Sequence, residues 1–122
     1  MEKRVEIYSE NVSNTVIYST DEPSENNNAN HEFVVSAELR SGEIDLQKIS
    51  LQHGPIKESG HNGIFMEHLI AICIDTLGKF QTSKYNCREN AIAKTKLEEA
   101  MMWLNKRTQN RVKRGVEGTN IV

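Results

Sequence analysis

The first half of the chain carries short runs of alternating hydrophobic and polar residues, the pattern typical of β-strands. RVEIYS (residues 4–9) and NTVIYST (14–20) are short and rich in β-branched and aromatic residues, which favour strands. In EFVVSAELR (32–40), every second residue falls on one face of the strand. The hydrophobic residues that share this face are Phe33, Val35, Ala37 and Leu39. The pattern therefore predicts three strands.

A fourth strand is predicted in EIDLQKISLQ (residues 43–52), directly after a turn at Ser41 and Gly42. Its hydrophobic residues change phase near Lys48, which indicates a β-bulge or a bend. Residues 32–52 are thus expected to form a hairpin, and the two N-terminal strands are expected to join its sheet. The polar stretch between the second and third strands predicts a long loop.

Hydrophobic spacing changes to that of helices in the second half. After a loop that contains three glycines and a proline, a first helix is predicted with Asn62 as its N-cap and an end near Gln81. This helix is apolar on all but a narrow stripe, so we expect it to be buried on most sides. One sheet and one partner helix would cover it poorly, which favours an oligomer.

A second helix is predicted after the turn TSKYN. Asn86 and Glu89 resemble a capping box at its start. Its end is expected near Lys113 or Arg114, because Gly115 suits the left-handed turn that ends many helices. The predicted core stripe of this helix consists of Ala93, Leu97, Ala100, Met101 and Leu104.

These elements predict an α+β fold. Residues 1–53 form an N-terminal antiparallel β-sheet region with a polar loop near residues 20–31. Residues 54–122 are expected to contain a loop and two helices that form a C-terminal antiparallel helical hairpin, the region through which the chain would oligomerise. A length of 122 residues suits one compact domain overall. Because only 37% of residues are hydrophobic, either part of the chain is disordered or part of the core lies between subunits.

Five cationic side chains gather at the end of the second predicted helix, and no acidic residue interrupts them. They are Lys106, Arg107, Arg111, Lys113 and Arg114. The whole chain has a net charge of −2, so any anion binding is expected to be local. The three arginines share one helix face, and arginine offers a planar fork for phosphate. Cations also stabilise a helix C-terminus, so both interpretations stay open.

Three aromatic residues could stack on a base. Phe80 lies on the hydrophobic side of the first helix, where packing is the simpler explanation. Tyr85 lies in the turn. Trp103, the only tryptophan, lies off the core stripe of the second helix and could equally be an interface residue.

Sequence motifs for catalysis or metal binding do not occur in the chain. GxSxG, P-loop, GxGxxG, HExxH and CxxC patterns are all missing. We therefore expect no enzyme, no metal ion and no cofactor. Cys73 and Cys87 are expected to be reduced thiols, too far apart in a helical hairpin to form a disulfide. The chain has no apolar run long enough for a membrane span and no secretory signal, which predicts a cytoplasmic protein.

Long strings in the second half resemble the phage Thoeris anti-defence protein family. They lie between Gly54 and Thr119 and include GPIKE, CREN, TKLEEA, WLNKRT and RGVEGT. That family shares its C-terminal helical domain with the anti-CBASS sponge proteins, which are shorter and mostly helical. The strand-rich first half is therefore more similar to the Thoeris type.

The resemblance implies a phage sponge protein. Such a protein binds cyclic nucleotide messengers of bacterial antiviral immunity and sequesters them without cleavage, in the cytoplasm of the infected host cell. The implied ligands are chiefly glycocyclic ADP-ribose isomers, with cyclic di- or trinucleotides as the alternative. The family also implies site residues. Phe80 would stack on a base, Asn90 would hydrogen-bond the ligand, and Arg107 and Arg111 would hold phosphates. A possible second pocket would use Lys57, Glu58 and Asn62.

The implied site residues require more than one chain. Asn90 and Arg107 are 17 residues apart, or roughly 25 Å along one helix. If two such helices pack antiparallel across a two-fold axis, the arginine end of one meets the Phe80 and Asn90 end of the other, and two pockets form. A homodimer, or a higher homo-oligomer such as a hexamer, is therefore expected.

Other functions remain as alternatives. A hydrolase of the same messengers lacks a recognisable catalytic set in this sequence. A small nucleic-acid-binding phage regulator would use the basic helix end and would bind DNA in a salt-sensitive manner, but the acidic residues elsewhere disfavour it. A protein-interaction module would not depend on Arg107 for binding small anions. No membrane or nucleic-acid partner is expected.

Overall fold

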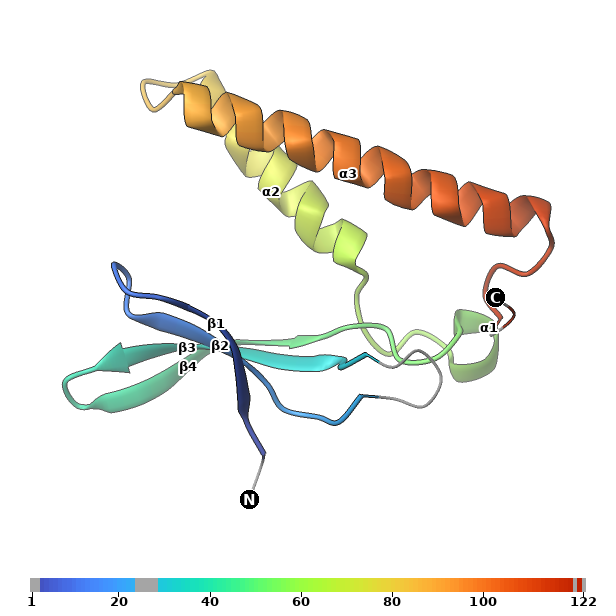
Figure 1. Ribbon diagram of the computed structural model, residues 1–122, viewed down its shortest axis with the longest axis horizontal. Coiled ribbons are helices and arrows are strands. Elements are labelled where there is room, and N and C mark those ends of the chain that lie inside the picture. The colour runs from blue at the N-terminus through green and yellow to red at the C-terminus, as the bar shows by residue number, and fades with distance from the viewer. Residues whose placement is uncertain (1–2, 24–28, 120, 122) are drawn as a thin grey trace. The chain divides into compact units, whose positions relative to one another are not determined.

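The computed structural model describes residues 3–23, 29–119 and 121. The chain divides into two compact units, Met1–Ile64 and Phe65–Val122. The first contains the sheet and one short helix, and the second contains two long helices (Figure 1). This arrangement confirms the predicted α+β fold.

Four antiparallel strands build the sheet of the first unit: β1 (Val5–Glu10), β2 (Thr15–Ser19), β3 (Glu32–Leu39) and β4 (Gly42–Ser50). Their order in the sheet, β1-β2-β3-β4, is the order along the chain (Figure 1). The predicted strands and the 32–52 hairpin are therefore confirmed. Part of the predicted polar loop, residues 24–28, lies outside the described residues.

A β-bulge interrupts the pairing of β3 with β4. Val35 pairs with Gln47, but the next residue of β3, Ser36, pairs with Asp45, so Leu46 is the extra residue. This bulge lies two residues before the phase change predicted at Lys48. It places Asp45 opposite Ser36, whose hydroxyl donates a hydrogen bond of 2.9 Å to Asp45 Oδ1.

The most deeply buried side chains of the sheet lie on the face opposite to the predicted hydrophobic one. Val16, Val34 and Ser36 are 2%, 1% and 0% exposed, and strand register places them on one face. Phe33 and Val35, which alternate with them, are only half-buried.

Arg4 explains this burial because it covers the face of the sheet that holds Val34 and Ser36. Its guanidinium donates hydrogen bonds of 3.1 and 3.0 Å to the two carboxylate oxygens of Asp45, and it lies 5.6 Å from the ring centroid of Tyr18. The Tyr18 hydroxyl donates to Glu43 at 2.8 Å. This polar layer, which we call the Arg4 network, shields the small side chains beneath it.

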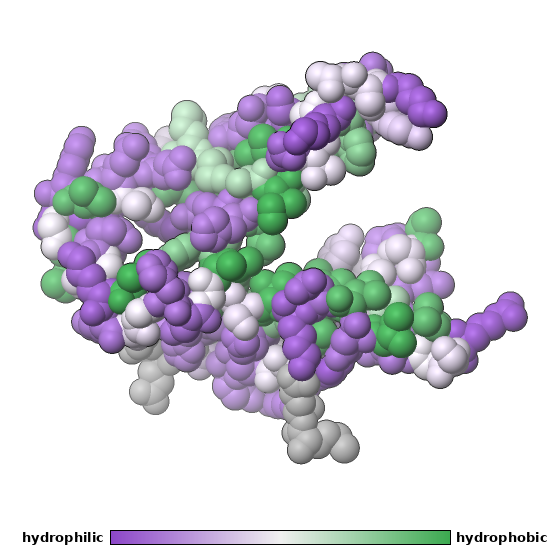
Figure 2. Space-filling model, turned by 180° about the vertical axis from the view of Figure 1, so that it is seen from behind, coloured by the Kyte–Doolittle hydropathy of each residue, from purple (hydrophilic) through white to green (hydrophobic). Residues whose placement is uncertain are grey.

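The other face of the sheet exposes hydrophobic residues. Val5, Leu39 and Ile44 are 49%, 49% and 45% exposed. Figure 2 shows hydrophobic surface over the sheet as well as over the helices. The face that alternation marks as hydrophobic is therefore not covered within this unit.

The glycine-rich segment after β4 is an ordered loop that contains the one-turn helix α1 (Ile56–Ser59). Gln52 donates through Nε2 to the carbonyls of Gly54 at 3.1 Å and Gly60 at 2.7 Å. A side chain at Gly63 would not fit, because its Cβ would lie 2.5 Å from the carbonyl carbon of Leu51.

Asn62 belongs to this loop and does not cap the following helix. Its amide closes a pair of hydrogen bonds with the backbone of His53, accepting at 2.8 Å and donating at 2.7 Å. His53 also stacks on the buried His31, with 4.3 Å between ring centroids. The helix begins later, because the N-cap is Phe65, whose N–H donates to Nδ1 of His68 at 3.0 Å. The predicted Asn62 cap is therefore wrong.

Two long helices, α2 (Met66–Gln81) and α3 (Arg88–Lys113), pack as an antiparallel hairpin in the second unit (Figure 1). Half-buried residues recur on α3 every three or four positions, the spacing of a coiled-coil seam. They include Asn90, Lys94, Leu97, Met101, Leu104, Thr108 and Arg111. Four residues of the predicted core stripe are half-buried, whereas Ala93 is exposed.

Helix α2 is not covered on most sides within this chain. None of the described side chains of α2 and α3 is fully buried, and Met66, Ile72 and Phe80 are 47%, 63% and 43% exposed. No helix in the described part of the chain has the length and apolar character that crossing a membrane requires.

The sequence predicted the C-terminal end of α3 correctly, but not its N-cap. The N-cap is Cys87, whose Sγ accepts the N–H of Asn90 at 3.4 Å, so the predicted Asn86 cap is wrong. At the other end, Gly115 has a φ of 72°. The N–H of Val116 donates to the carbonyl of Arg111 at 3.1 Å, as in a Schellman motif. The predicted stop at Gly115 is confirmed.

Candidate functional site

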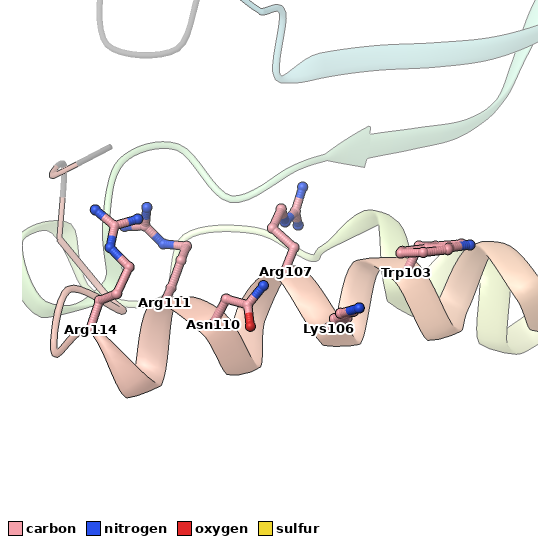
Figure 3. Close-up of a pocket in the computed structure, with 6 residues that line it drawn as sticks. All are labelled: Trp103, Lys106, Arg107, Asn110, Arg111 and Arg114. Carbon is pink, nitrogen blue, oxygen red and sulfur yellow. The ribbon is translucent and has the colours of Figure 1, made fainter.

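A shallow groove of about 480 Å³ follows the C-terminal half of α3. It is lined by Trp103, Lys106, Arg107, Asn110, Arg111 and Arg114. These residues recur every three or four positions, so a single helix face presents all of them. Figure 3 shows the three arginine side chains projecting from the same side of the helix. The shared face inferred from arginine spacing is confirmed.

Acidic residues from outside this part of α3 lie close to two of the arginines. Arg107 Nη2 lies 3.8 Å from Glu67 Oε2, contributed by α2. Arg111 Nε donates to Glu117 Oε2 at 3.2 Å, beyond the end of α3. The sequence between Trp103 and Arg114 contains no acid, but folding supplies two. The positive potential of the groove is therefore weaker than the number of cationic residues on α3 alone would indicate.

Arg111 holds the segment that follows α3. Besides the bond to Glu117, its Nη1 donates to the carbonyl of Ile121 at 2.7 Å. Its Nη2 donates to the carbonyls of Val116 and Thr119, both at 3.0 Å. The side chain is 23% exposed. A phosphate contact by Arg111 would have to share or replace some of these hydrogen bonds.

Arg107 is the more accessible of the two arginines. Its side chain is 54% exposed, and its ion pair with Glu67 is long, at 3.8 Å. Glu67 is only 22% exposed, but an ion pair this long, with its arginine largely exposed, contributes little and is readily exchanged. Arg107 can therefore turn toward a phosphate without disrupting the hairpin.

Phe80 and Asn90 lie at the other end of the hairpin, near the turn between α2 and α3. The ring of Phe80 meets that of Tyr85 edge to face, with 6.4 Å between centroids. Asn90 Nδ2 donates to the Tyr85 carbonyl at 3.5 Å. Phe80 is 43% exposed. The structure thus places these two predicted ligand residues at one end of α3 and the two arginines at the other.

The residues of the possible second pocket belong to the loop after β4. Lys57 and Glu58 lie on α1 with exposed side chains. The amide of Asn62 is engaged by the backbone of His53, so its first role is to hold the loop. Lys57 is the cation that this loop presents at its surface.

Three residues near the two ends of α3 were not predicted as site residues from the sequence. Lys106 and Asn110 line the groove only because helix geometry brings them beside the arginines. At the turn, Lys84 Nζ lies 5.2 Å from the ring centroid of Tyr85. A helical wheel would have identified the first two, whereas the conformation of the turn was not predictable. The described residues contain no group of three or more metal-binding side chains.

Comparison with known proteins agrees with this hairpin. A family model described as Acb2/Tad1, hairpin domain, matches residues 43–109. A relative named Thoeris anti-defense 1, from Bacillus phage SBSphiJ7, is 59% identical over 75 residues. That alignment covers 62% of this chain and 53% of the relative, so the chain matches about half of the relative's length.

The family match includes most of the helical hairpin. It runs from β4 through α2 and most of α3. Phe80, Asn90 and Arg107 lie inside it, and Arg111 lies two residues beyond. Because residues 43–109 make up more than half of the chain and contain the packed pair α2 and α3, the chain belongs to the Acb2/Tad1 hairpin-domain family.

Proposed function

We propose that this protein is an anti-defence sponge that blocks Thoeris signalling. It binds cyclic nucleotide immune messengers, chiefly glycocyclic ADP-ribose isomers, and sequesters them without cleavage in the cytoplasm of the infected bacterial host. The proposal draws on membership in the hairpin-domain family and on the relative named for Thoeris anti-defence. The observation that carries it is the exposed Arg107 in a groove lined by three arginines.

The chemistry of the groove suits a ligand that carries phosphates. Arginine forms paired hydrogen bonds with phosphate oxygens and keeps its charge at all physiological pH values. The half-exposed ring of Phe80, at the other end of the hairpin, offers a surface on which a base can stack. A nucleotide messenger carries both phosphates and a base, so the proposed site includes residues from both ends of α3.

The proposed pocket is composite, because one chain separates its two halves. Two copies of α3 that pack antiparallel would bring Arg107 and Arg111 of one copy to Phe80 and Asn90 of the other. Exposed hydrophobic residues on α2, such as Met66 and Ile72, provide surface for such contacts between copies. The assembly is therefore proposed to be a homodimer or a higher homo-oligomer.

A binding and release experiment tests the proposal. Purified protein is mixed with glycocyclic ADP-ribose, unbound ligand is removed, the protein is heat-denatured, and the released compound is analysed by mass spectrometry. Intact ligand is expected near one equivalent per chain, with strong losses for Arg107→Ala and Asn90→Ala. Lys113→Ala is the matched control, because it removes a positive charge from the same helix end outside the groove lining.

Other results of this experiment would point elsewhere. Recovery of cleaved ligand would identify an enzyme and contradict sequestration. If glycocyclic ADP-ribose does not bind, cyclic di- and trinucleotides are the next ligands to test, with Lys57→Ala reporting on the second pocket. Salt-sensitive DNA binding would support a nucleic-acid-binding regulator, although Glu67 and Glu117 beside the arginines reduce the attraction of this surface for DNA.

A further inference from the structure

We infer that Trp103 is a second stacking residue of the proposed site, and that it holds the base of a purine nucleotide beside the phosphate bound by Arg107. This inference rests on the proposed function and deepens it. The resemblance to the family assigned stacking to Phe80 alone. The structure adds an aromatic residue at the arginine end of α3, within the same groove.

Exposure is the first observation behind this role. Trp103 is 57% exposed although it is the largest hydrophobic residue of the chain. Tryptophan usually buries most of its surface, and here it lies off the seam by which α3 packs on α2. Its ring therefore does not serve the packing of the hairpin and is available to a partner molecule.

Position relative to Arg107 is the second observation. The two residues are one helical turn apart, which places their Cβ atoms about 6 Å from each other. Figure 3 shows the indole of Trp103 and the guanidinium of Arg107 on the same side of α3. A base and the phosphate of the same nucleotide are separated by a similar distance, so one nucleotide can contact both side chains.

The third observation is a contact between Lys106 and the ring of Trp103, which restrains the ring. The Nζ of Lys106 lies 5.1 Å from the centroid of the Trp103 ring, within the range of a cation–π interaction. Such a contact limits the rotation of an exposed indole and so lowers the entropy lost on stacking. The same ammonium group adds positive charge beside the phosphate position.

The sequence makes this inference easy to measure, because Trp103 is the only tryptophan of the chain. Tryptophan fluorescence, excited at a wavelength that the three tyrosines do not absorb, therefore reports on this one ring. Glycocyclic ADP-ribose is titrated into a fixed concentration of protein, and ribose 5-phosphate serves as a probe that has a phosphate but no base. We expect saturable quenching with the first compound and no quenching with the second.

Calorimetric titration of variants completes the test. Trp103→Ala is expected to weaken binding of glycocyclic ADP-ribose by roughly 10- to 100-fold, the loss typical of one stacked base, whereas Trp103→Phe keeps most of the affinity. Met102→Ala is the matched control, because this neighbour is also hydrophobic and 58% exposed but does not line the groove. Its affinity is expected to stay within about threefold of wild type.

The outcomes separate this inference from the function on which it rests. If the ligand binds and depends on Arg107, but fluorescence does not change and Trp103→Ala binds normally, the stacking role is overturned and the sponge function stands. If fluorescence follows protein concentration and not ligand, Trp103 is a contact between copies, and the inference is again overturned. If no nucleotide binds to wild-type protein, the proposed function fails and the stacking role fails with it.

Discussion

Arg107 and Arg111 lie one helical turn apart, yet their surroundings differ. Among the described residues, Arg111 donates four hydrogen bonds to the segment after α3, whereas Arg107 forms one long ion pair, with Glu67. We predict that Arg111→Ala lowers the free energy of unfolding by about 1–3 kcal/mol, because the part-buried carbonyls of Val116 and Thr119 lose a donor. Arg107→Ala is expected to lower it by less than about 0.5 kcal/mol. Urea denaturation of ligand-free protein measures both.

The difference between the two alanine variants shows which arginine stabilises the fold. Equal losses for the two alanine variants would mean that the bonds of Arg111 to the C-terminal segment do not form in solution. Arg111→Lys is a useful intermediate, because an ammonium keeps the charge but cannot reach four acceptors in the same geometry.

Asp45 carries a prediction about acid stability. The hydrogen bonds from Arg4 and then from Ser36 lower the pKa of its carboxyl from 3.8 to about 2. Because the folded-state pKa lies below the unfolded one, the unfolded protein binds more protons in this range. The contribution of Asp45 to stability is therefore complete above about pH 4 and is lost as the pH falls from 3.8 toward 2. A carbon-detected NMR titration of Asp45 should give a midpoint near 2.

A variant without the Arg4 guanidinium tests the cause of this shift. In Arg4→Gln the midpoint of Asp45 is expected to rise toward 3.8. Lys3→Gln is the matched control, since Lys3 is the adjacent cation and pairs with Glu22 at 2.9 Å instead. An unchanged midpoint in Arg4→Gln would show that the Arg4 network does not hold Asp45.

At the scale of elements, the start of α3 provides a direct test of its cap. The Sγ of Cys87 accepts the N–H of Asn90, but sulfur is a weak acceptor. Cys87→Ser is therefore expected to keep or slightly raise the melting temperature, because serine is among the best N-caps. Cys87→Ala is expected to cost up to about 1 kcal/mol of unfolding free energy. Thermal denaturation under reducing conditions separates the variants.

Asn86→Ala serves as the comparison for this cap. The sequence assigned the cap to Asn86, whereas in the structure its own N–H donates to Ser83 in the turn at 3.3 Å. Its replacement is expected to change stability by less than the Cys87→Ala substitution. A larger loss for Asn86→Ala would restore the assignment made from sequence.

At the scale of the whole molecule, the composite pocket predicts complementation between two inactive variants. Arg107→Ala and Asn90→Ala chains each fail to bind glycocyclic ADP-ribose alone. In a mixed dimer, however, one pocket combines the intact Arg107 of one chain with the intact Asn90 of the other. After subunit exchange by dilution and reconcentration, about a quarter of the wild-type binding capacity is expected to return, since half of the dimers are mixed and each has one intact pocket. Equilibrium dialysis measures this capacity.

The control for complementation is a mixture that cannot form an intact pocket. Arg107→Ala mixed with an Arg107→Ala, Asn90→Ala double variant should remain inactive under the same exchange. If the first mixture also stays inactive although mass spectrometry shows mixed dimers, the pocket does not use these two residues from different chains.

Local sequence patterns were enough to predict the kinds of elements and their order. Alternation predicted the strands, because successive side chains of a strand point to opposite faces. Hydrophobic spacing of three and four predicted both helices, and Gly115 marked the end of α3, because a left-handed residue there favours glycine. The shared face of the three arginines also followed from helix geometry alone. These features depend on neighbours close in sequence.

The surroundings of each side chain, in contrast, depend on how the chain folds. The sequence predicted Asn62 as a helix N-cap, but its side-chain amide forms hydrogen bonds with the backbone of His53 instead. Phe33 marked a hydrophobic face, but Arg4, distant in sequence, covers the opposite one. The arginine cluster looked uniformly positive until folding placed Glu67 and Glu117 beside two of its members. In each case the deciding partner lies outside the three- or four-residue spacing of a helix or the two-residue spacing of a strand, from six to 40 residues away along the chain. Local spacing therefore cannot indicate it, whereas hydrogen bonding and charge act on distance in space.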